Sequence, residues 1–324
     1  MIPYGRQEIT DEDIAEVVKV LRSDFLTQGP TVPKFEKSVA NYCDASYAVA
    51  VNSATSALHI ACLALDLGPK DWLWTSSNTF VASANCGRYC GANIDFVDID
   101  PNNYNMSIEA LSVKLQEAEK KGNLPKIVIP VHFAGLPCDM TAINSLSKKY
   151  GFKIIEDASH AVGASYNKKK VGSCIDSDIT VFSFHPVKIV TTGEGGMALT
   201  NDKYLAEKMS RLRVHGITDD EVLMKQRPKN EIWNYQQIEL GFNYRMNDIQ
   251  AALGLSQMSR LDDYIKKRHI IAELYDKNFS NWPIKTPWKS SEFYSSYHLY
   301  PVRIEEDLKL KTQKEIYQEL RKTG

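Results

Sequence analysis

The sequence predicts an α/β protein built around a mainly parallel sheet. Short apolar runs alternate with longer segments of helical periodicity, as strands and crossover helices do in parallel sheets. Several of these runs are apolar at consecutive positions, which indicates strands that are buried on both faces. Because ligands collect at the carboxyl ends of such strands, residues that directly follow a strand are the candidates for a functional site.

The expected elements begin with an amphipathic helix over residues 12–22, where apolar residues recur at helical spacing. Strands joined by helices imply right-handed crossovers, with helices on both faces of the sheet. The strands are expected at residues 47–51, 93–97, 126–131, 152–156 and 179–184, and the helices between them at 55–67, 79–91, 107–121 and 139–150.

The pattern changes near residue 247, which predicts a second, smaller domain. We expect a large domain over residues 1–246, with an N-terminal segment at 1–30, and a small α+β domain over residues 247–324. No strand follows the last expected helix, so the small domain is expected to be truncated. Its expected elements are a helix over 261–279, a strand over 298–304 and a helix over 311–322.

The composition is that of an ordinary folded protein with no global charge. Hydrophobic residues make up 43% of the 324 residues and charged residues 24%. Lys and Arg number 39 against 40 Asp and Glu, a net charge of −1, which argues against nucleic acid or an anionic membrane as a partner. The N-terminus lacks a signal-peptide pattern, and no apolar run approaches the ~20 residues of a membrane span. We therefore expect a cytoplasmic protein.

The six cysteines include one close pair, Cys86 and Cys90, and no second pair at the spacing of a zinc site. Disulfides are rare in a reducing compartment. We expect neither a metal site nor a disulfide.

A turn of small residues, Asn52-Ser-Ala-Thr-Ser-Ala-Leu58, follows the first expected strand and precedes a helix. Free amides at a helix N-terminus, together with the hydroxyls of Thr55 and Ser56, can hold a phosphate, because unsatisfied donors and the helix dipole both favour an anion. The same turn also suits simple helix capping by Ser53 or Thr55. By itself it leaves both interpretations open.

Two acids in the segment Glu156-Asp-Ala-Ser-His160 lie where the strand at 152–156 ends. An acid at this end of a parallel strand can serve an active site, although a capping residue or a solvated loop charge would look the same in the sequence. His160 can likewise be a reactive group or a histidine with only structural hydrogen bonds.

The segment Ser183-Phe-His-Pro-Val-Lys188 begins at the end of the last of these strands and precedes the turn Gly193-Glu-Gly-Gly196. An amine next to apolar residues loses its proton more readily than a free amine and becomes a nucleophile for carbonyl compounds. Lys188 is therefore a candidate nucleophile, with a plain surface charge as the alternative.

In this order, the three segments resemble those of fold-type I enzymes that use pyridoxal phosphate, and in detail the DegT/DnrJ/EryC1/StrS family of nucleotide-sugar aminotransferases. The resemblance runs from Leu26-Thr-Gln-Gly-Pro30 to Gly241-Phe-Asn-Tyr-Arg-Met-Asn-Asp-Ile-Gln-Ala-Ala-Leu-Gly254 and covers nearly the whole chain. It implies the aspartate aminotransferase fold, with a large α/β/α domain and a small domain. It also implies pyridoxal 5′-phosphate as cofactor and a homodimer with shared active sites.

The resemblance assigns the catalytic roles to Lys188 and Asp157. Lys188 would hold the cofactor covalently and move a proton between the amino-acid Cα and the cofactor. Asp157 would face the pyridine nitrogen and keep it protonated, so that the ring can accept electrons. A lysine at this position favours transamination, because dehydratase relatives that lack the covalent link carry histidine there.

The resemblance also implies the remaining contacts with the cofactor and the substrate. His160 stands where many relatives carry glutamine, and either side chain can donate a hydrogen bond to the phenolic oxygen. Phe80 would stack on the cofactor ring, although its position alone also suits core packing. The other implied contacts are Thr55, Ser56 and Ser183 to the phosphate, Asn243 to the phosphate in the neighbouring subunit, Arg245 to the diphosphate of the sugar nucleotide, and Tyr4 and Thr27 in the sugar pocket.

The implied reaction moves an amino group from L-glutamate to C4 of a UDP-4-keto-6-deoxy-N-acetylhexosamine. The segments 156–163 and 183–196 most resemble those of the family members that make UDP-4-amino-4,6-dideoxy-N-acetyl-β-L-altrosamine for pseudaminic acid biosynthesis. Three alternatives stay open: the same chemistry on a precursor of bacillosamine, legionaminic acid or perosamine; a non-catalytic relative that binds a sugar nucleotide; and a nicotinamide-dependent dehydrogenase. The last lacks support because no Gly-x-Gly-x-x-Gly follows the first strand.

Overall fold

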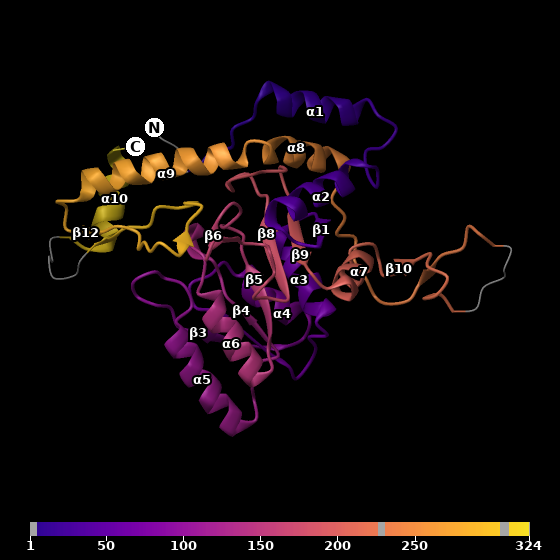
Figure 1. Cartoon of the computed structure of the whole chain (residues 1–324), viewed down its shortest axis with the longest axis horizontal. Helices are drawn as coiled ribbons and strands as arrows, with labels where there is room; N and C mark the ends of the chain where they lie inside the picture. The colour runs from indigo at the N-terminus through magenta and orange to yellow at the C-terminus, as the bar shows by residue number, and fades with distance from the viewer. Residues whose placement is uncertain (1–4, 226–230, 305–310, 324) are drawn as a thin grey trace.

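A computed structural model of the chain describes residues 5–225, 231–304 and 311–323. Within them, the central sheet has seven strands in the order β1-β9-β8-β5-β4-β2-β3 (Figure 1). Every neighbouring pair is parallel except those made by β9, which runs antiparallel to β1 and β8. The α/β fold with a mainly parallel sheet is thus confirmed. The strands are β1 (Tyr47–Val51), β2 (Trp72–Ser76), β3 (Asn93–Val97), β4 (Ile127–Ile129), β5 (Lys153–Asp157), β8 (Ile179–Ser183) and β9 (Gly196–Thr200).

The apolar runs of the sequence predict five of these strands, β1, β3, β4, β5 and β8, with small shifts at their ends. β2 and β9 lie outside every predicted run. The helix predicted over 79–91 is shorter in the structure, where α4 spans Ala82–Tyr89.

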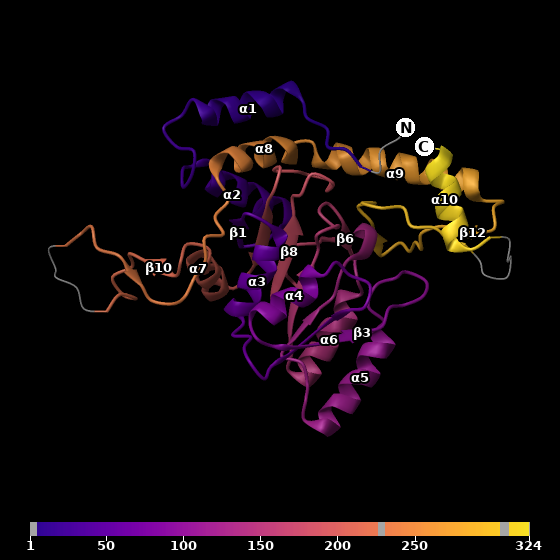
Figure 2. The same ribbon diagram turned by 180° about the vertical axis from the view of Figure 1, so that it is seen from behind.

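Helices cover both faces of the sheet (Figures 1 and 2). Successive residues of β4 point to opposite faces: Ile127 and Ile129 join one core, and Val128 joins another. The first core lies under α3 (Ala54–Ala64), α4 and α7 (Lys203–Leu212). The second lies under α5 (Ile108–Lys121) and α6 (Met140–Tyr150), and a third lies under α2 (Thr31–Cys43) and α8 (Asp248–Met258).

The N-terminal helix α1 (Asp11–Leu21) lies along α8 and confirms the helix predicted over 12–22 (Figure 1). Its buried Asp13 accepts two hydrogen bonds from the Arg260 guanidinium, at 2.8 and 2.7 Å. Such a paired charge-assisted contact fixes both groups in one geometry. The boundary predicted between residues 246 and 247 directly precedes α8, which packs on α1 and α2.

After α8, the long helix α9 (Leu261–Phe279) confirms the helix predicted over 261–279, and α10 (Gln313–Thr323) that over 311–322. The strand predicted over 298–304 is wrong for most of its length, because only Arg303–Ile304 is a strand, β14. The residues at its start have other partners: the Leu299 amide donates to the Ala134 carbonyl at 3.2 Å, and Arg268 of α9 donates to the His298 carbonyl at 3.3 Å. The other short elements are η1 (Phe133–Gly135), β6 (Ser165–Tyr166), β7 (Lys169–Lys170), β12 (Ile284–Lys285) and β13 (Phe293–Tyr294).

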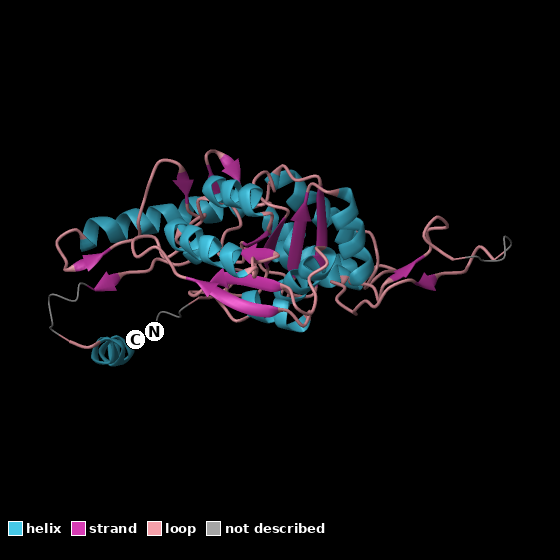
Figure 3. Ribbon diagram, turned by 90° about the horizontal axis from the view of Figure 1, so that it is seen from below, coloured by secondary structure: helices cyan, strands magenta, loops and turns pink. Residues whose placement is uncertain are grey.

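A long arm, described over residues 217–225 and 231–240, projects from the body (Figures 1 and 3). It contains the paired strands β10 (Ile217–Thr218) and β11 (Gln236–Gln237). Its exposed apolar side chains are Val222, Leu223, Ile232, Trp233, Tyr235, Ile238 and Leu240.

Within the described residues, no helix has the length and apolar character needed to cross a membrane.

Candidate active site

A cavity of about 770 Å³ lies where β5 and β8 end and α3 begins. This is the carboxyl end of parallel strands, where α/β proteins bind their ligands. The cavity brings together seven of the residues predicted for the site, from four separate segments of the chain. They are Thr55, Ser56, Phe80, Asp157, His160, Ser183 and Lys188.

The N-terminus of α3 opens into this cavity. Ser53 caps the helix by accepting a hydrogen bond from the Ser56 amide at 3.1 Å. The amides of Ala54 and Thr55 precede the first intrahelical donor, and both residues line the cavity. Gly196 of β9 lies so close that a side chain there would overlap the backbone of this turn. The capping interpretation is thus correct for Ser53, and the turn also offers open amides that can bind an anion.

Asp157 ends β5 and is only 4% exposed, which excludes a solvated loop charge. One carboxylate oxygen accepts a hydrogen bond from the Ser83 hydroxyl at 2.5 Å. The other accepts one from the Ser159 amide at 3.1 Å. Ser83 belongs to α4, and nothing in the sequence indicates this contact, because the two residues are far apart along the chain. The two donors orient the carboxylate at the cavity wall.

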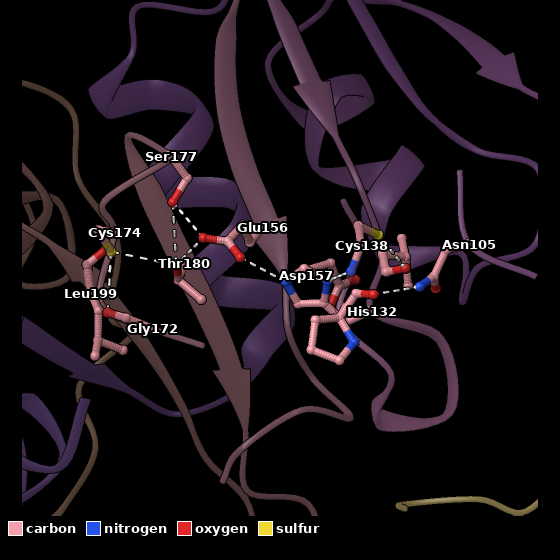
Figure 4. A network of polar contacts seen from close by, with 12 residues as sticks. Asn105, His132, Cys138, Glu156, Asp157, Gly172, Cys174, Ser177, Thr180 and Leu199 are labelled. Atoms are coloured by element: carbon pink, nitrogen blue, oxygen red, sulfur yellow. Dashed lines mark hydrogen bonds and ion pairs between the residues drawn. The ribbon is translucent and has the colours of Figure 1, made fainter. Parts of the chain in front are cut away.

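The preceding residue, Glu156, lies in a closed network of polar contacts on the other face of β5 (Figure 4). It bonds to the His132 imidazole at 2.7 Å and to the hydroxyls of Ser177 and Thr180, the latter at 2.8 Å. Burial tends to raise the pKa of Glu156, but these hydrogen bonds hold the pKa below its ordinary value. The network therefore keeps a buried carboxylate ionised.

His132 connects this network to Asp157. Its Nδ1 accepts a hydrogen bond from the Cys138 amide at 3.0 Å, so the ring proton lies on Nε2 and is donated to Glu156. Its own backbone amide donates to the Asp157 carbonyl at 3.1 Å. The closed network thus holds the strand end that carries Asp157.

Lys188 lies in the turn after β8 and is half-buried at the cavity wall. Burial lowers the pKa of its amine below the ordinary value, and the charge of Asp157 partly opposes this. The amine is therefore neutral more often than a surface lysine is. Of the two interpretations of Lys188 in the sequence, the plain surface charge is wrong.

His160 packs against His298, which the loop after β13 brings to the site, with ring centroids 4.3 Å apart. Burial, with a smaller effect from the Lys188 charge, lowers the pKa of His160 to about 4, so the ring is neutral at physiological pH. Among the described residues, neither Nδ1 atom has a hydrogen-bond partner, although both are buried. His160 is therefore not a histidine with only structural hydrogen bonds. His298 was not predicted as a site residue, because a lone histidine in an apolar segment does not by itself indicate a site.

Phe80 lines the cavity and is 74% exposed, so the core-packing interpretation is wrong and a flat apolar face is available to a ligand. The cavity wall also includes Gln250 of α8, which donates to the Glu194 carbonyl at 2.9 Å. Sequence reasoning missed both of these polar residues. Helix α8, with which the predicted small domain begins, therefore borders the same cavity as the large domain.

Three predicted residues do not line this cavity in the described chain: Asn243, Arg245 and Thr27. Asn243 is exposed and makes an isolated bridge to Val214 near the base of the arm. Arg245 makes a similar bridge to Val51, and Thr27 makes one to Asn247. Tyr4 lies outside the described residues.

The sequence profile of the DegT/DnrJ/EryC1/StrS aminotransferase family matches residues 7–324. The chain belongs to this family. It is 40% identical over 304 residues to the UDP-4-amino-4,6-dideoxy-N-acetyl-β-L-altrosamine transaminase of Campylobacter jejuni, covering 93% of this chain and 76% of that protein. It is also 40% identical over 306 residues to the spore coat polysaccharide biosynthesis protein SpsC of Bacillus subtilis, covering 94% and 76%.

Solved structures of DegT/DnrJ/EryC1/StrS aminotransferases have the same fold. Helicobacter pylori PseC, an aminotransferase of pseudaminic acid biosynthesis, matches with a TM-score of 0.87 and 33% identity, over 99% of this chain and 82% of that one. The pyridoxal-phosphate form of the sugar aminotransferase Spr1654 from Streptococcus pneumoniae matches with a TM-score of 0.86 and 30% identity, over 99% and 82%. The aminotransferase fold predicted from the sequence is confirmed.

The protein is thus an aminotransferase that uses pyridoxal 5′-phosphate and acts on nucleotide sugars. The cavity fits this cofactor. The open amides of α3 suit its phosphate, the carboxylate of Asp157 suits a protonated ring nitrogen, and the amine of Lys188 suits its aldehyde. His160 also lines the cavity, and its buried Nδ1 has no hydrogen-bond partner among the described residues.

Proposed function

We propose that the protein transfers an amino group from L-glutamate to C4 of a UDP-4-keto-6-deoxy-N-acetylhexosamine. The products would be 2-oxoglutarate and UDP-4-amino-4,6-dideoxy-N-acetyl-β-L-altrosamine, a precursor of pseudaminic acid. The observation that carries this proposal is the convergence of Lys188, Asp157 and the α3 amides on one cavity. The similarity to the Campylobacter transaminase supports the choice of sugar.

In this proposal, Lys188 and Asp157 perform the chemistry. When bound, the cofactor supplies an electron sink for the charge that develops at the donor Cα. The Nζ atom of Lys188 holds the cofactor and then takes the proton from that Cα, a task that suits an amine with a lowered pKa. Asp157, fixed by Ser83 and Ser159, keeps a proton on the ring nitrogen.

The surrounding residues orient the cofactor. Thr55, Ser56 and Ser183 add hydroxyl donors to the α3 amides around the phosphate, and a helix N-terminus favours its negative charge. Phe80 offers its exposed ring as a stacking face. His160, which is neutral at physiological pH, donates a hydrogen bond to the phenolic oxygen.

We further propose a homodimer with shared active sites. Asn243 is exposed and lies outside its own chain's cavity, at the base of an arm whose apolar side chains face solvent. Burying these side chains against a second copy would remove apolar area from water. Asn243 and Arg245 would then serve the cofactor phosphate and the sugar diphosphate of the neighbouring subunit. Tyr4 and Thr27 would border the sugar.

A second candidate is the same transfer to another nucleotide 4-keto sugar, such as a precursor of bacillosamine, legionaminic acid or perosamine. The specific observation in its favour is the relative SpsC, which is as similar to this chain as the Campylobacter transaminase is. Loops read the sugar, and a few polar contacts suffice to discriminate epimers. A non-catalytic sugar-nucleotide-binding relative would not need the buried Asp157 and the desolvated Lys188.

The test is to incubate the protein with pyridoxal phosphate, L-glutamate and a panel of UDP-4-keto-6-deoxy-N-acetylhexosamines that differ in C5 configuration, and to identify each product by NMR. We expect NMR to show the C4 configuration of the β-L-altro product. We also expect the keto sugar that leads to this product to have the highest kcat/KM in the panel. Higher kcat/KM with another keto sugar would establish the second candidate instead. Failure of every keto sugar, with Lys188→Ala no different from the wild type, would contradict both.

A further inference from the structure

The ring of His160 packs on the ring of His298, which lies far from it in the sequence. The ring centroids are 4.3 Å apart, and the ring planes are tilted by 37°. His160 lines the cavity, whereas His298 is not among the described residues that do. A ligand in the cavity therefore meets His298 only through His160.

The loop that carries His298, residues 295–299, is bound to the backbone of His160 itself. The Ser296 hydroxyl donates a hydrogen bond to the His160 carbonyl at 2.8 Å, and the Ser296 amide donates to the Gly135 carbonyl at 3.0 Å. A side chain at Gly135 would collide with the Ser296 hydroxyl and the His160 carbonyl. The glycine thus allows the loop to approach the site this closely.

Helix α9 holds the same loop through Arg268. The Arg268 guanidinium donates to the Tyr297 carbonyl at 2.9 Å and to the His298 carbonyl at 3.3 Å. Tyr297 has a φ of 46°, in the left-handed region that a bulky residue rarely adopts and keeps only where surrounding contacts impose it. These contacts therefore fix the backbone of His298 relative to that of His160.

The ring nitrogens show that no hydrogen bond to Nδ1 sets the orientation of His160. This Nδ1 is buried and has no hydrogen-bond partner among the described residues, and the same holds for His298. His132 is the contrast, because its Nδ1 accepts a hydrogen bond from the Cys138 amide at 3.0 Å. With Nδ1 sealed, Nε2 is the ring nitrogen of His160 that a ligand in the cavity can reach. The contact with His298 is what holds the ring.

The charged groups around the two rings favour the neutral form of both. Burial, and then the Lys188 charge, lower the pKa of His160, while the Asp157 charge raises it. Burial also lowers the pKa of His298 well below its ordinary value, followed by the effects of His160, Lys188 and Arg268. Two neutral rings can pack face to face without charge repulsion, and each keeps one ring proton to donate.

We propose that His298 is a positioning residue for the transamination: its ring holds that of His160 so that the Nε2 hydrogen of His160 points into the cavity, toward the phenolic oxygen of the cofactor. This inference rests on the proposed function, in which His160 donates that hydrogen bond. Without the neighbouring ring, the His160 side chain can turn about its own bonds, and the donor loses its direction. The role requires a flat ring at residue 298 rather than a ring nitrogen.

The test is a pH titration of the absorption band of the protein loaded with pyridoxal phosphate. A hydrogen bond donated to an oxygen stabilises the charged form of that oxygen and lowers the pH at which the group loses its proton. His160→Ala should therefore raise the pH midpoint by about 0.5–1 unit. His298→Ala should raise the midpoint in the same direction, and so should His298→Leu, which fills more of the space and guards against misfolding. His298→Phe, which keeps a flat ring, should stay near the wild type.

A midpoint in His298→Ala and His298→Leu equal to that of the wild type would overturn the proposal, while a shift in His160→Ala would still leave the role of His160 standing. No shift in His160→Ala would overturn the proposal together with the contact to the phenolic oxygen. The titration uses no sugar, so a failure of the transfer to the sugar does not affect its outcome.

A double variant tests whether His298 acts through His160. In the His160→Ala background, His298→Ala should add no further shift, because the group that it positions is already absent. Shifts that add up in the double variant would mean that His298 acts on the cofactor independently, which would overturn the positioning role.

The matched control is His269→Phe, in another histidine that holds the 295–299 loop. His269 donates to the Ser295 carbonyl at 2.7 Å and stacks on Tyr294 with ring centroids 4.3 Å apart. This variant loosens the loop but keeps the ring of His298, so we expect a lower Tm and an unchanged pH midpoint. A shift as large as that of His298→Ala would show that loosening the loop is sufficient, and would overturn the assignment to His298.

Discussion

The two faces of β5 at its carboxyl end carry adjacent carboxylates in opposite surroundings. On one face, Glu156 is enclosed by His132, Ser177 and Thr180, and its oxygens bond to protein groups. On the other, Asp157 borders an open cavity and is only oriented by the protein. The comparison teaches that hydrogen-bond partners, rather than residue type, separate a structural acid from a reactive one.

The largest effect is expected on the open face from Lys188→Ala. Removing the amine removes both the covalent hold on the cofactor and the proton carrier, so turnover should fall by about 10⁴-fold or more. The Glu156 face is untouched, so Tm should change little. The measurement is 2-oxoglutarate formation under saturating substrates. A variant that kept a tenth of the wild-type rate would remove Lys188 from the mechanism.

Asp157→Asn is the next largest change. The amide keeps the shape of the side chain but not its charge, so we expect a loss of roughly 10²–10³-fold in kcat with the free energy of unfolding nearly unchanged. Steady-state kinetics measure kcat, and urea unfolding of the same preparation measures the free energy of unfolding. An unchanged kcat would mean that the charge does not face the reacting ring.

Glu156→Gln should give the opposite pattern. Its buried hydrogen bonds to charge are lost or weakened, so we expect unfolding to become easier by about 2–3 kcal/mol while kcat stays within a few-fold of the wild type. A matched control is Glu117→Gln, an exposed glutamate paired with Lys121, for which less than about 0.5 kcal/mol is expected. Equal losses in the two variants would contradict the closed network.

The difference in stability between the wild type and Glu156→Gln should depend on pH. The pKa of Glu156 lies below its ordinary value, so the stabilisation from its charge is complete above that value and is lost as pH falls through the lowered pKa. The stability gap between the wild type and Glu156→Gln should therefore close on acidification. Urea unfolding at a series of acidic pH values measures the gap, and a gap that widened would reverse the sign of the argument.

The smallest expected effect is that of the Asp157 charge on the pKa of Lys188. Burial lowers the pKa of Lys188 and the Asp157 charge raises it, so Asp157→Asn should shift the pH midpoint of cofactor attachment to lower pH. A spectroscopic pH titration of the loaded protein gives this midpoint. Ser83→Ala, which keeps the charge, should leave the midpoint closer to that of the wild type.

The sequence predicted the open face better than the closed one. Asp157, Ser183 and Lys188 follow buried apolar runs, and the geometry of a parallel sheet places such residues together at one edge. The hydrogen bonds to Glu156 and Asp157 come from residues such as His132 and Ser83, which have no periodic signal and meet them only through tertiary packing.

Errors in the predicted elements have similar causes. β9 runs antiparallel to both of its neighbours, so the rule of strand, crossover helix and parallel strand does not indicate it. Residues 298–302 look apolar enough for a strand, yet their backbone bonds to the loop at Ala134 and to Arg268. That arrangement is what brings His298 against His160.

The most direct test of the contrast at β5 is the absorption spectrum of the protein with pyridoxal phosphate, before and after L-glutamate. The account predicts a band of lysine-bound cofactor in the wild type and in Glu156→Gln, removed by glutamate and missing from Lys188→Ala. Borohydride reduction should fix the cofactor to the peptide that contains Lys188. Attachment at another lysine, or an unchanged band in Lys188→Ala, would contradict the assignment of the open face as the active site.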